Sequence, residues 1–98
     1  MLREIIWSPL AEQDLRNILE YLAENWNQKI TIHFLNKIDL ATSQIAKIPN
    51  QFPIINKKLQ VRKCVVTKQN TLYYRYIEKR IEILRLFDTR QNPKKLRF

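Results

Sequence analysis

The densest run of apolar residues lies late in the chain, from Ile81 to Phe87, and it stops abruptly at a polar segment. The run has the length of a strand, and its Ile, Leu and Phe residues crowd too closely for a strand with one exposed face. Residues 88–92 form turns or hydrogen bonds readily, and Pro93 cannot continue a ladder of strand hydrogen bonds. The pattern predicts a buried central strand whose polar tip is either a functional site or only a solvated strand exit.

Two helical stripes of apolar residues precede this strand. Ser8 and Pro9 form a start signal for the first helix, because the Ser hydroxyl can accept a hydrogen bond from a first-turn amide and Pro loses none there. The first stripe predicts an amphipathic helix from Pro9 to about Asn25, and its members are Ala11, Leu15, Ile18 and Leu22. The second stripe predicts a helix that ends at Pro49, and its members are Thr31, Phe34, Ile38, Ala41, Ile45 and Ile48. The two helices are expected to form an antiparallel hairpin.

Patterns of strand type occupy most of the remaining chain. A short strand is expected over residues 3–7, and a β-meander over 61–67, 71–77 and 81–87. Residues 51–58 are interpreted as an irregular loop. The order β-α-α-β-β-β predicts an α+β fold, in which the helical hairpin packs on one face of a mostly antiparallel four-stranded sheet.

The length bounds this fold, since 98 residues with 45% hydrophobic content form one core. A single domain over residues 1–98 is therefore expected. Its second sheet face, rich in Arg, Lys and Tyr, is expected to be open. The tyrosines there, Tyr73, Tyr74 and Tyr76, are either stacking platforms for nucleic-acid bases or part of the rim of the core.

Charge divides the chain into two unequal parts. The net charge is +9. Residues 1–56 contain five Lys or Arg against six Asp or Glu, a net charge of −1, whereas residues 57–98 contain thirteen against three, a net charge of +10. Such concentration is typical of a surface that meets phosphates or an acidic protein, although a solvated basic face kept for solubility is the alternative.

Composition excludes several classes of site. The chain has no Gly, so glycine-rich phosphate loops and dinucleotide fingerprints are excluded. Cys64 is the one cysteine and is expected to be a small core residue, and His33 has no second ligand at metal-binding spacing, so no metal or cofactor is expected. The charged start of the chain does not resemble a signal peptide, and no apolar run approaches the roughly 18 residues of a membrane span. A cytoplasmic protein without a membrane partner is expected.

Two sets of motifs occur along the chain in an order that is typical of a known family. The first is the helix start Trp7-Ser8-Pro9-Leu10-Ala11-Glu12-Gln13-Asp14-Leu15, followed by Ile18 and Tyr21. The second comprises Pro49, Val61-Arg62, Tyr74-Arg75, Ile81-Glu82-Ile83-Leu84, Arg90 and Pro93. Together they resemble the RelE/ParE superfamily of type II toxin-antitoxin toxins, closer to the ParE side, over nearly the whole chain. The fold that this resemblance implies is similar to the β-α-α-β-β-β order.

The resemblance implies one of two mechanisms for a growth-inhibiting toxin. ParE-like members inhibit DNA gyrase by binding, and RelE-like members are metal-independent endoribonucleases that cut messenger RNA on the ribosome. RelE-like cleavage uses a strand arginine, an arginine after the last strand and a C-terminal Tyr or His. Arg62 and Arg90 match the two arginines, which would hold the scissile phosphate, but the C-terminal Tyr or His is not matched. ParE-like inhibition is therefore favoured over cleavage, and a non-toxic nucleic-acid-binding module is the further alternative.

The candidate residues follow from the resemblance and from charge. Candidates for catalysis or target binding are Arg62, Lys63, Arg85, Asp88 and Arg90. Candidates for contact with nucleic acid or target are Lys57, Lys58, Tyr74, Lys94, Lys95 and Arg97. Either toxin mechanism implies a cognate acidic antitoxin, which would fold across a groove beside the helical hairpin or over the basic sheet face.

Overall fold

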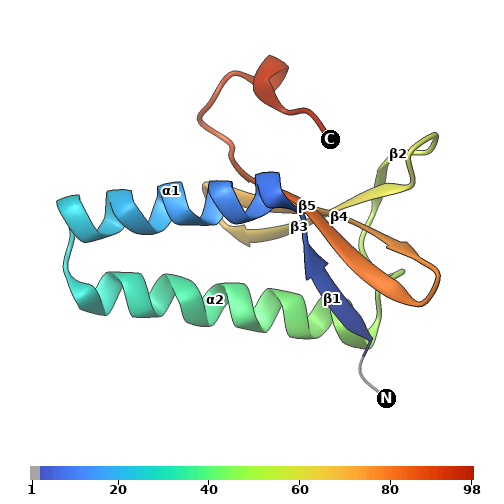
Figure 1. The fold of residues 1–98 in the computed structure, drawn as a ribbon, viewed down its shortest axis with the longest axis horizontal. Coiled ribbons are helices and arrows are strands. Elements are labelled where there is room, and N and C mark those ends of the chain that lie inside the picture. Colours follow the sequence, from blue (N-terminus) through green and yellow to red (C-terminus); the bar gives the residue numbers. More distant parts are fainter. Residues whose placement is uncertain (1–2) are drawn as a thin grey trace.

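The structure, a computed structural model, describes residues 3–98 and has the predicted α+β architecture. Figure 1 shows helix α1 (Pro9–Asn25) and helix α2 (Gln28–Lys47) running antiparallel beside a twisted sheet. The strands are β1 (Glu4–Trp7), β2 (Ile54–Asn56), β3 (Val61–Thr67), β4 (Asn70–Ile77) and β5 (Arg80–Asp88), and a short 3-10 helix, η1, spans Pro93–Lys95. The predicted helical hairpin and β-meander are confirmed.

The sheet has five strands in the order β1-β5-β4-β3-β2, one more than predicted. The additional strand is β2, which lies in the segment interpreted as loop and pairs Ile54 with Arg62 and Asn56 with Val61. A strand this short has no measurable periodicity, so its sequence gave no sign of it. β1 pairs in parallel with β5, and the other pairs are antiparallel, so β5 lies inside the sheet as expected.

Local signals set the bounds of both helices. The Ser8 hydroxyl accepts a hydrogen bond from Ala11 N at 3.0 Å, and Pro9 opens α1 as predicted. The Asn27 side chain caps α2 in the same way, accepting from Ile30 N at 3.0 Å. Helix α2 ends at Lys47, because Pro49 disfavours helical geometry at the residue before it. Ile48 is therefore outside the helix and 57% exposed, so its predicted place in the apolar stripe is wrong.

One face of the sheet, here called the inner face, packs against the helices and forms the core. Leu72 and Tyr74 of β4 and Ile81 and Ile83 of β5 are fully buried on it. The helices contribute Ala11, Phe34, Ile38, Ala41, Ile45 and Ala46. Fully burying one such large apolar side chain stabilises the fold by about 1.5–3 kcal/mol. Cys64 is 2% exposed in this core, as predicted, and burial raises the pKa of its thiol.

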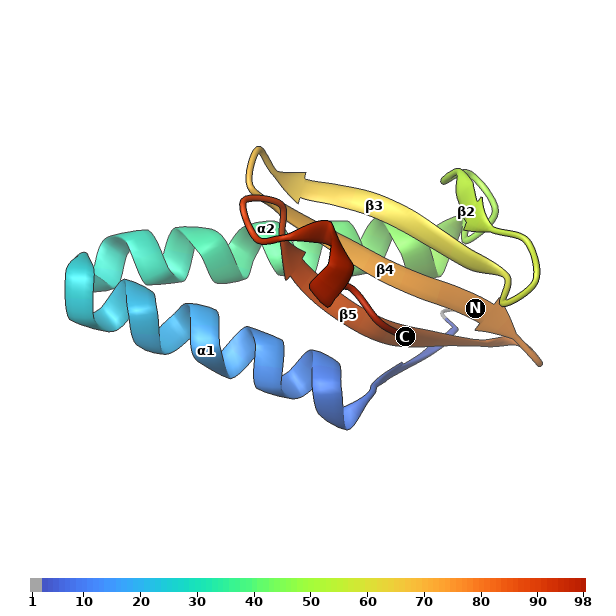
Figure 2. The ribbon, with the colours of Figure 1, turned by 90° about the horizontal axis from the view of Figure 1, so that it is seen from above.

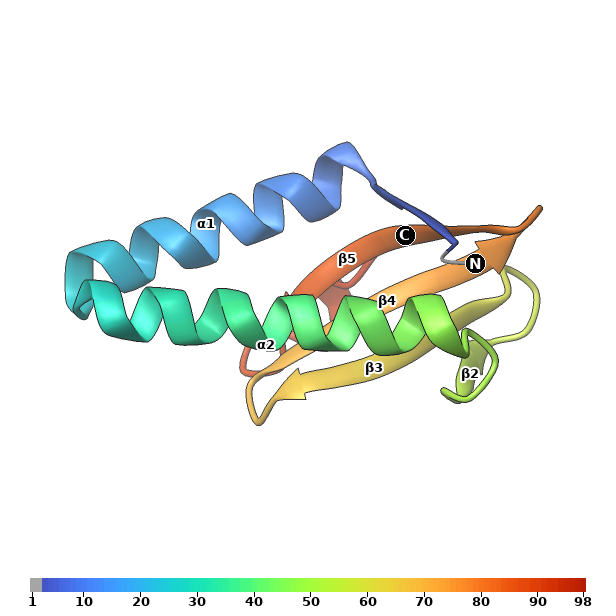
Figure 3. The same ribbon diagram turned by 90° about the horizontal axis from the view of Figure 1, so that it is seen from below.

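The opposite face, here called the outer face, is not fully open. Figure 2 shows the end of the chain lying over β4 and β5, and Figure 3 shows α2 across the other side of the same strands. Thr71, Arg85 and Phe87 belong to the outer face by their register and are nevertheless buried. The C-terminal tail, residues 93–98, thus covers part of the surface that was expected to be exposed. None of the helices in residues 3–98 has the length and apolarity needed to cross a membrane.

Candidate target-binding surface

A β-bulge near the end of β5 decides which side chains reach the outer face. Tyr73 pairs with Arg85 and Tyr74 pairs with Ile83, so Leu84 has no partner in β4. In a regular strand Arg85 would share the inner face with Ile81 and Ile83, because side chains alternate. The extra residue instead turns Arg85 to the outer face.

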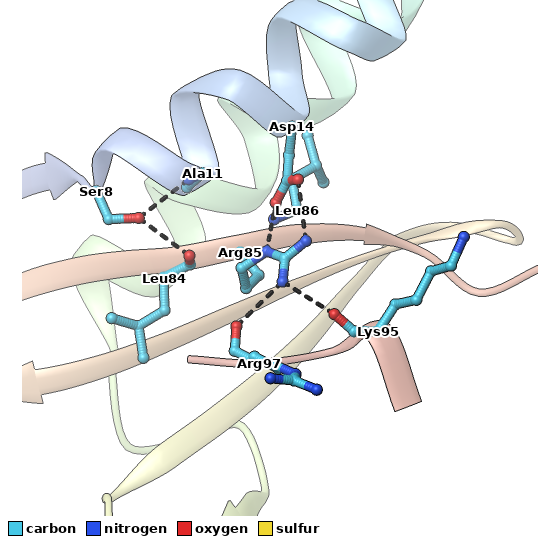
Figure 4. Close-up of polar contacts among 8 residues, drawn as sticks. All are labelled: Ser8, Ala11, Asp14, Leu84, Arg85, Leu86, Lys95 and Arg97. Atoms are coloured by element: carbon cyan, nitrogen blue, oxygen red, sulfur yellow. Dashed lines mark hydrogen bonds and ion pairs between the residues drawn. The ribbon is translucent and has the colours of Figure 1, made fainter. Parts of the chain in front are cut away.

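Helix α1 completes the edge of β5 where β1 stops. Ser8 N donates to Ile83 O at 2.9 Å, and the Ser8 hydroxyl donates to Leu84 O at 3.0 Å. Six residues further along the chain, on α1, the Asp14 carboxylate accepts from Leu86 N at 3.0 Å. Figure 4 shows the contacts of Ser8 with Leu84 and of Asp14 with Leu86 along the strand. The Asp14 carboxylate is therefore held in place by the backbone of β5.

Arg85 is a structural residue and not a free target-binding group. Its Nε and Nη2 donate to the two Asp14 oxygens at 2.7 and 3.1 Å, with the Arg85 and Asp14 side chains 10% and 14% exposed. Its Nη1 donates to the carbonyls of Lys95 and Arg97 at 3.4 and 3.1 Å (Figure 4). The prediction that Arg85 binds a target is wrong, because both the helix and the tail occupy its donors.

Tyr74 is likewise wrong as a contact for nucleic acid. It is fully buried, and its hydroxyl donates to the carbonyl of the buried Pro49 at 2.6 Å. Burial raises the pKa of this hydroxyl far above its ordinary value. Tyr76 also packs against the core, so of the meander tyrosines only Tyr73 lies on the outer face, where its ring meets Phe98 at a centroid distance of 5.4 Å. The core interpretation of Tyr74 and Tyr76 is correct.

The polar tip, residues 88–92, ends β5 in an exposed ion pair. Arg90 donates to both Asp88 oxygens at 3.0 and 2.7 Å, and its side chain is 59% exposed. These hydrogen bonds hold the pKa of the Asp88 carboxyl below its usual range, and the pair raises the pKa of Arg90. Thr89 N donates to Gln69 O at 2.8 Å, so the tip lies against the turn between β3 and β4. Arg90 and Asp88 are both accessible, but the hydrogen bonds from Arg90 keep Asp88 in its carboxylate form.

Arg62 lies far from the tip. It belongs to the start of β3, and its Nη1 donates to the carbonyls of Asn50 and Phe52 at 3.1 and 2.6 Å. Arg90 lies beyond the other end of that strand, beside Gln69. At 3.3 Å per strand residue the two positions are separated by about 16 Å or more. The structure does not bring together the two arginines that the resemblance assigned to one phosphate.

The remaining predicted cations are exposed in three places. Lys57 and Lys58 lie in the turn after β2, and Lys63 projects from β3 on the outer face, opposite Tyr73. Lys94, Lys95 and Arg97 are exposed on the tail. The basic surface is therefore spread over the tail, one strand and one turn, with no single cluster that would mark a reaction centre.

A groove lies between the helices and the polar tip, beside the helical hairpin as expected, although the sequence did not identify its lining residues. It has a volume of about 620 Å³, and Ile18, Tyr21, Leu22, Trp26, Ile30 and Phe34 form its apolar wall. Asp14, Asn70, Asp88 and Arg90 are among its polar lining residues. Tyr21 and Trp26 are 50% and 59% exposed there. The available signal was a pair of large aromatic residues beside the helix stripe, where packing against the sheet did not require them.

Acid-base groups and metal ligands do not gather in the part of the chain that the structure describes. Within residues 3–98 there is no group of three or more His, Cys, Asp or Glu side chains that could hold a metal ion. His33, the one histidine of the chain, is exposed on α2, on the helix side of the sheet. The accessible chemistry is that of a cationic surface beside an apolar groove.

Comparison with known proteins places the chain in a family. No curated protein sequence matches it significantly. Solved structures that share its fold include the following three. A chromosomal ParDE toxin-antitoxin system from P. aeruginosa aligns with a TM-score of 0.74 and 18% identity, over 89% of this chain and 96% of that one. The RelBE2 toxin-antitoxin complex from Mycobacterium tuberculosis aligns with a TM-score of 0.62 and 14% identity, over 90% of this chain and 99% of that one. A YoeB/ParE toxin from Agrobacterium tumefaciens aligns with a TM-score of 0.65 and 12% identity, over 87% of this chain and 96% of that one.

The similarity extends from fold to sequence family. Residues 5–93 match the family described as the ParE toxin of the type II toxin-antitoxin system parDE. The matched range contains the Ser8 cap, the Asp14–Arg85 pair and the polar tip, and it ends at the start of the tail. The resemblance to the RelE/ParE superfamily is confirmed, and this chain belongs to the ParE toxin family of type II toxin-antitoxin systems.

Proposed function

We propose that this type II toxin stops growth by binding DNA gyrase through its exposed basic surface, and that it does not cut messenger RNA. The observation that carries the proposal is the separation of Arg62 from Arg90. A ribonuclease that uses the 2′-hydroxyl must stabilise charge on one phosphate, which requires cations that converge on it. These two lie at opposite ends of β3 and cannot share a phosphate.

The groups available for proton transfer support the same proposal. General acid-base catalysis needs a group that titrates near neutral pH and reaches the reacting atom. Hydrogen bonds from Arg90 lower the pKa of Asp88, burial raises the pKa of the Tyr74 hydroxyl, and His33 is on the helix side of the sheet. Lys63 is exposed on the outer face. A binding mechanism needs no such group.

Charge and exposure fit a macromolecular target. The cations of the tail, of β3 and of the tip are all exposed, and they are Lys94, Lys95, Arg97, Lys63 and Arg90. A surface of this kind raises the rate of encounter with an anionic partner and makes binding depend on salt. We expect gyrase inhibition to weaken as ionic strength rises above about 0.15 M, where the Debye length is roughly 8 Å.

We also propose a cognate acidic antitoxin that occupies the groove. The similar solved structures include a ParDE system and a RelBE2 toxin-antitoxin complex, and the chain carries a net charge of +9. An amphipathic helix fits a groove whose wall is apolar and whose rim carries Arg90, since its apolar side enters and its acidic side faces the cation. Replacing Trp26 with Ala should weaken antitoxin binding, whereas Leu40→Ala, an equally exposed apolar position outside the groove, should not.

The decisive experiment is pulse-labelling of DNA and protein synthesis in bacteria, just after induction of the chain without an antitoxin. Gyrase inhibition predicts that DNA synthesis falls first and that the response to DNA damage is induced. An immediate fall in protein synthesis, with RNA fragments that end in a 2′,3′-cyclic phosphate, would overturn the proposal in favour of ribosome-dependent cleavage. No effect on either, from folded protein, would leave only a nucleic-acid-binding module.

Purified components provide the second arm of the test. The chain should inhibit supercoiling by gyrase, and Arg90→Ala should reduce that inhibition. Arg16→Ala is the matched control, because Arg16 also forms an exposed ion pair, with Glu12, but on α1 outside the groove and the basic surface. Equal losses for the two variants would show an effect of net charge alone and would contradict a role for the tip.

A further inference from the structure

The C-terminal tail is attached to the rest of the fold through very few contacts. Its own turn is closed by Lys95 N donating to Asn92 O at 2.9 Å and Lys94 N donating to the Asn92 side chain at 3.0 Å. Within residues 3–98, its hydrogen bonds to the sheet all come from one side chain, Arg85, through the carbonyls of Lys95 and Arg97. A free tail of six residues, three of them charged, would be disordered.

Arg85 can hold the tail because Asp14 fixes the plane of its guanidinium. The Asp14 carboxylate takes Nε and Nη2 on one side, which leaves Nη1 directed at the tail (Figure 4). Asp14 is itself fixed by Leu86 N. A planar fork with donors on two edges can join two elements in this way, whereas the ammonium group of Lys cannot.

Burial on the outer face is consistent with an ordered tail. Phe87 is 4% exposed although it lies outside the core cluster, and the Arg85 guanidinium lies 5.8 Å from the centre of its ring. Further along, Phe98 packs on Tyr73 with the rings inclined at 57°. The tail thus covers an apolar strip of the outer face while Lys94, Lys95 and Arg97 remain exposed.

We propose that Arg85 is the positioning residue of the basic tail, and that Asp14 on α1 orients Arg85 for this task. The two carbonyl contacts fix the backbone, so the three cations of the tail project from a defined surface. Asp14 also lines the groove, so a change at the groove wall reaches the tail through one side chain. The positioning itself follows from these contacts alone, and its importance for toxicity rests on the proposed binding function.

The first test uses the unaltered chain made by cell-free synthesis. Heteronuclear relaxation should show residues 93–98 as rigid as β5, with a nuclear Overhauser contact between the Tyr73 and Phe98 rings. A tail that moves freely on the picosecond to nanosecond timescale in folded wild-type protein would overturn the proposal without any variant.

The second test measures release of Phe98 by carboxypeptidase A. Loss of two hydrogen bonds should accelerate release about tenfold in Arg85→Gln and in Arg85→Lys, and Asp14→Asn should accelerate it several-fold. Arg75→Gln is the matched control, because Arg75 pairs with Glu82 on the same face and makes no tail contact. Folded Arg85 variants with wild-type release rates would overturn the proposal, and a wild-type rate in Asp14→Asn alone would remove Asp14 from it.

Toxicity separates this inference from the proposed function. A folded Arg85→Lys variant with a released tail should inhibit growth less than Arg75→Gln does. If its tail is released and growth inhibition is unchanged, positioning by Arg85 stands and the tail is not part of the target-binding surface.

Discussion

Arg85 and Arg90 lie toward the same end of β5, and each forms a two-point ion pair with an aspartate, yet the two pairs lie in different surroundings. The Arg85 pair reaches Asp14 on another element, and its side chains are 10% and 14% exposed. The Arg90 pair reaches back only to Asp88, and its arginine is 59% exposed. The comparison teaches that burial and sequence separation, not residue type, decide whether an arginine in this part of the chain holds the fold or stays exposed to solvent.

The largest expected effect is on stability when the buried pair is broken. Arg85→Ala leaves the Asp14 carboxylate without its cation in a site that water reaches poorly, so the free energy of unfolding should fall by about 3 kcal/mol. Urea denaturation followed by circular dichroism measures this. The matched control is Arg75→Ala, whose partner Glu82 is more exposed than Asp14. A loss no larger than that of the control would mean that the two pairs at the end of β5 are not different in kind.

A smaller loss is expected when both members of the buried pair become apolar. In Asp14→Leu with Arg85→Met no charge is left buried, so stability should recover roughly half of the loss seen in Arg85→Ala. Recovery should be incomplete, because Leu86 N loses the acceptor that Asp14 provides. If the double variant is less stable than Arg85→Ala, the cost of the single change does not come from an unpaired carboxylate.

The sequence predicted the elements of this fold much better than it predicted their contacts. The Ser8–Pro9 cap and the helical stripes are local signals, since the hydrogen bonds and spacings that create them lie within a few residues. The ion pair between Asp14 and Arg85 joins residues 71 positions apart, and nothing in the local pattern relates them. The bulge at Leu84 could not be predicted from the local pattern either, and it is the reason why the Arg85 side chain lies on the outer face.

Only part of the candidate site could be predicted, because here too the sequence shows local signals and not contacts between distant residues. The tip at Asp88 and Arg90 could be found because a buried strand ended there in polar residues. That Arg62 would lie at the far end of β3 depends on strand register, which the pattern does not give. The groove depends on how two helices and a turn meet, so Trp26 could be noticed in the sequence but not assigned.

Removing Arg90 should affect function much more than folding. Because the side chain is exposed and its partner is local, Arg90→Ala should leave the midpoint of urea unfolding unchanged within error. Under the proposed function it should weaken target binding about tenfold, as expected for a central arginine of an interface. The urea midpoint and the concentration needed for half-inhibition of gyrase are to be measured on the same preparation. A clear loss of stability would make Arg90 a structural residue like Arg85.

The smallest effect concerns Asp88 and appears only as a dependence on pH. Hydrogen bonds from Arg90 lower the pKa of the Asp88 carboxyl, so the ionised form is bound more strongly in the folded state than in the unfolded state. A lowered folded pKa contributes stability that is fully present above the ordinary carboxyl value, about 3.9, and that is lost as pH falls through the folded value.

Asp88→Asn removes this contribution, so the variant should be slightly less stable than wild type at pH 7, and the difference should shrink as pH falls through the lowered pKa of Asp88. Urea midpoints from pH 2 to 7 measure the difference. Glu82→Gln should behave in the same way, because hydrogen bonds from Arg75 lower the pKa of Glu82. A difference between Asp88→Asn and wild type that is constant with pH would mean that the amide disturbs packing at the tip. The contrast between the two arginine pairs would then rest on burial alone, because the exposed pair would contribute no charge-dependent stability.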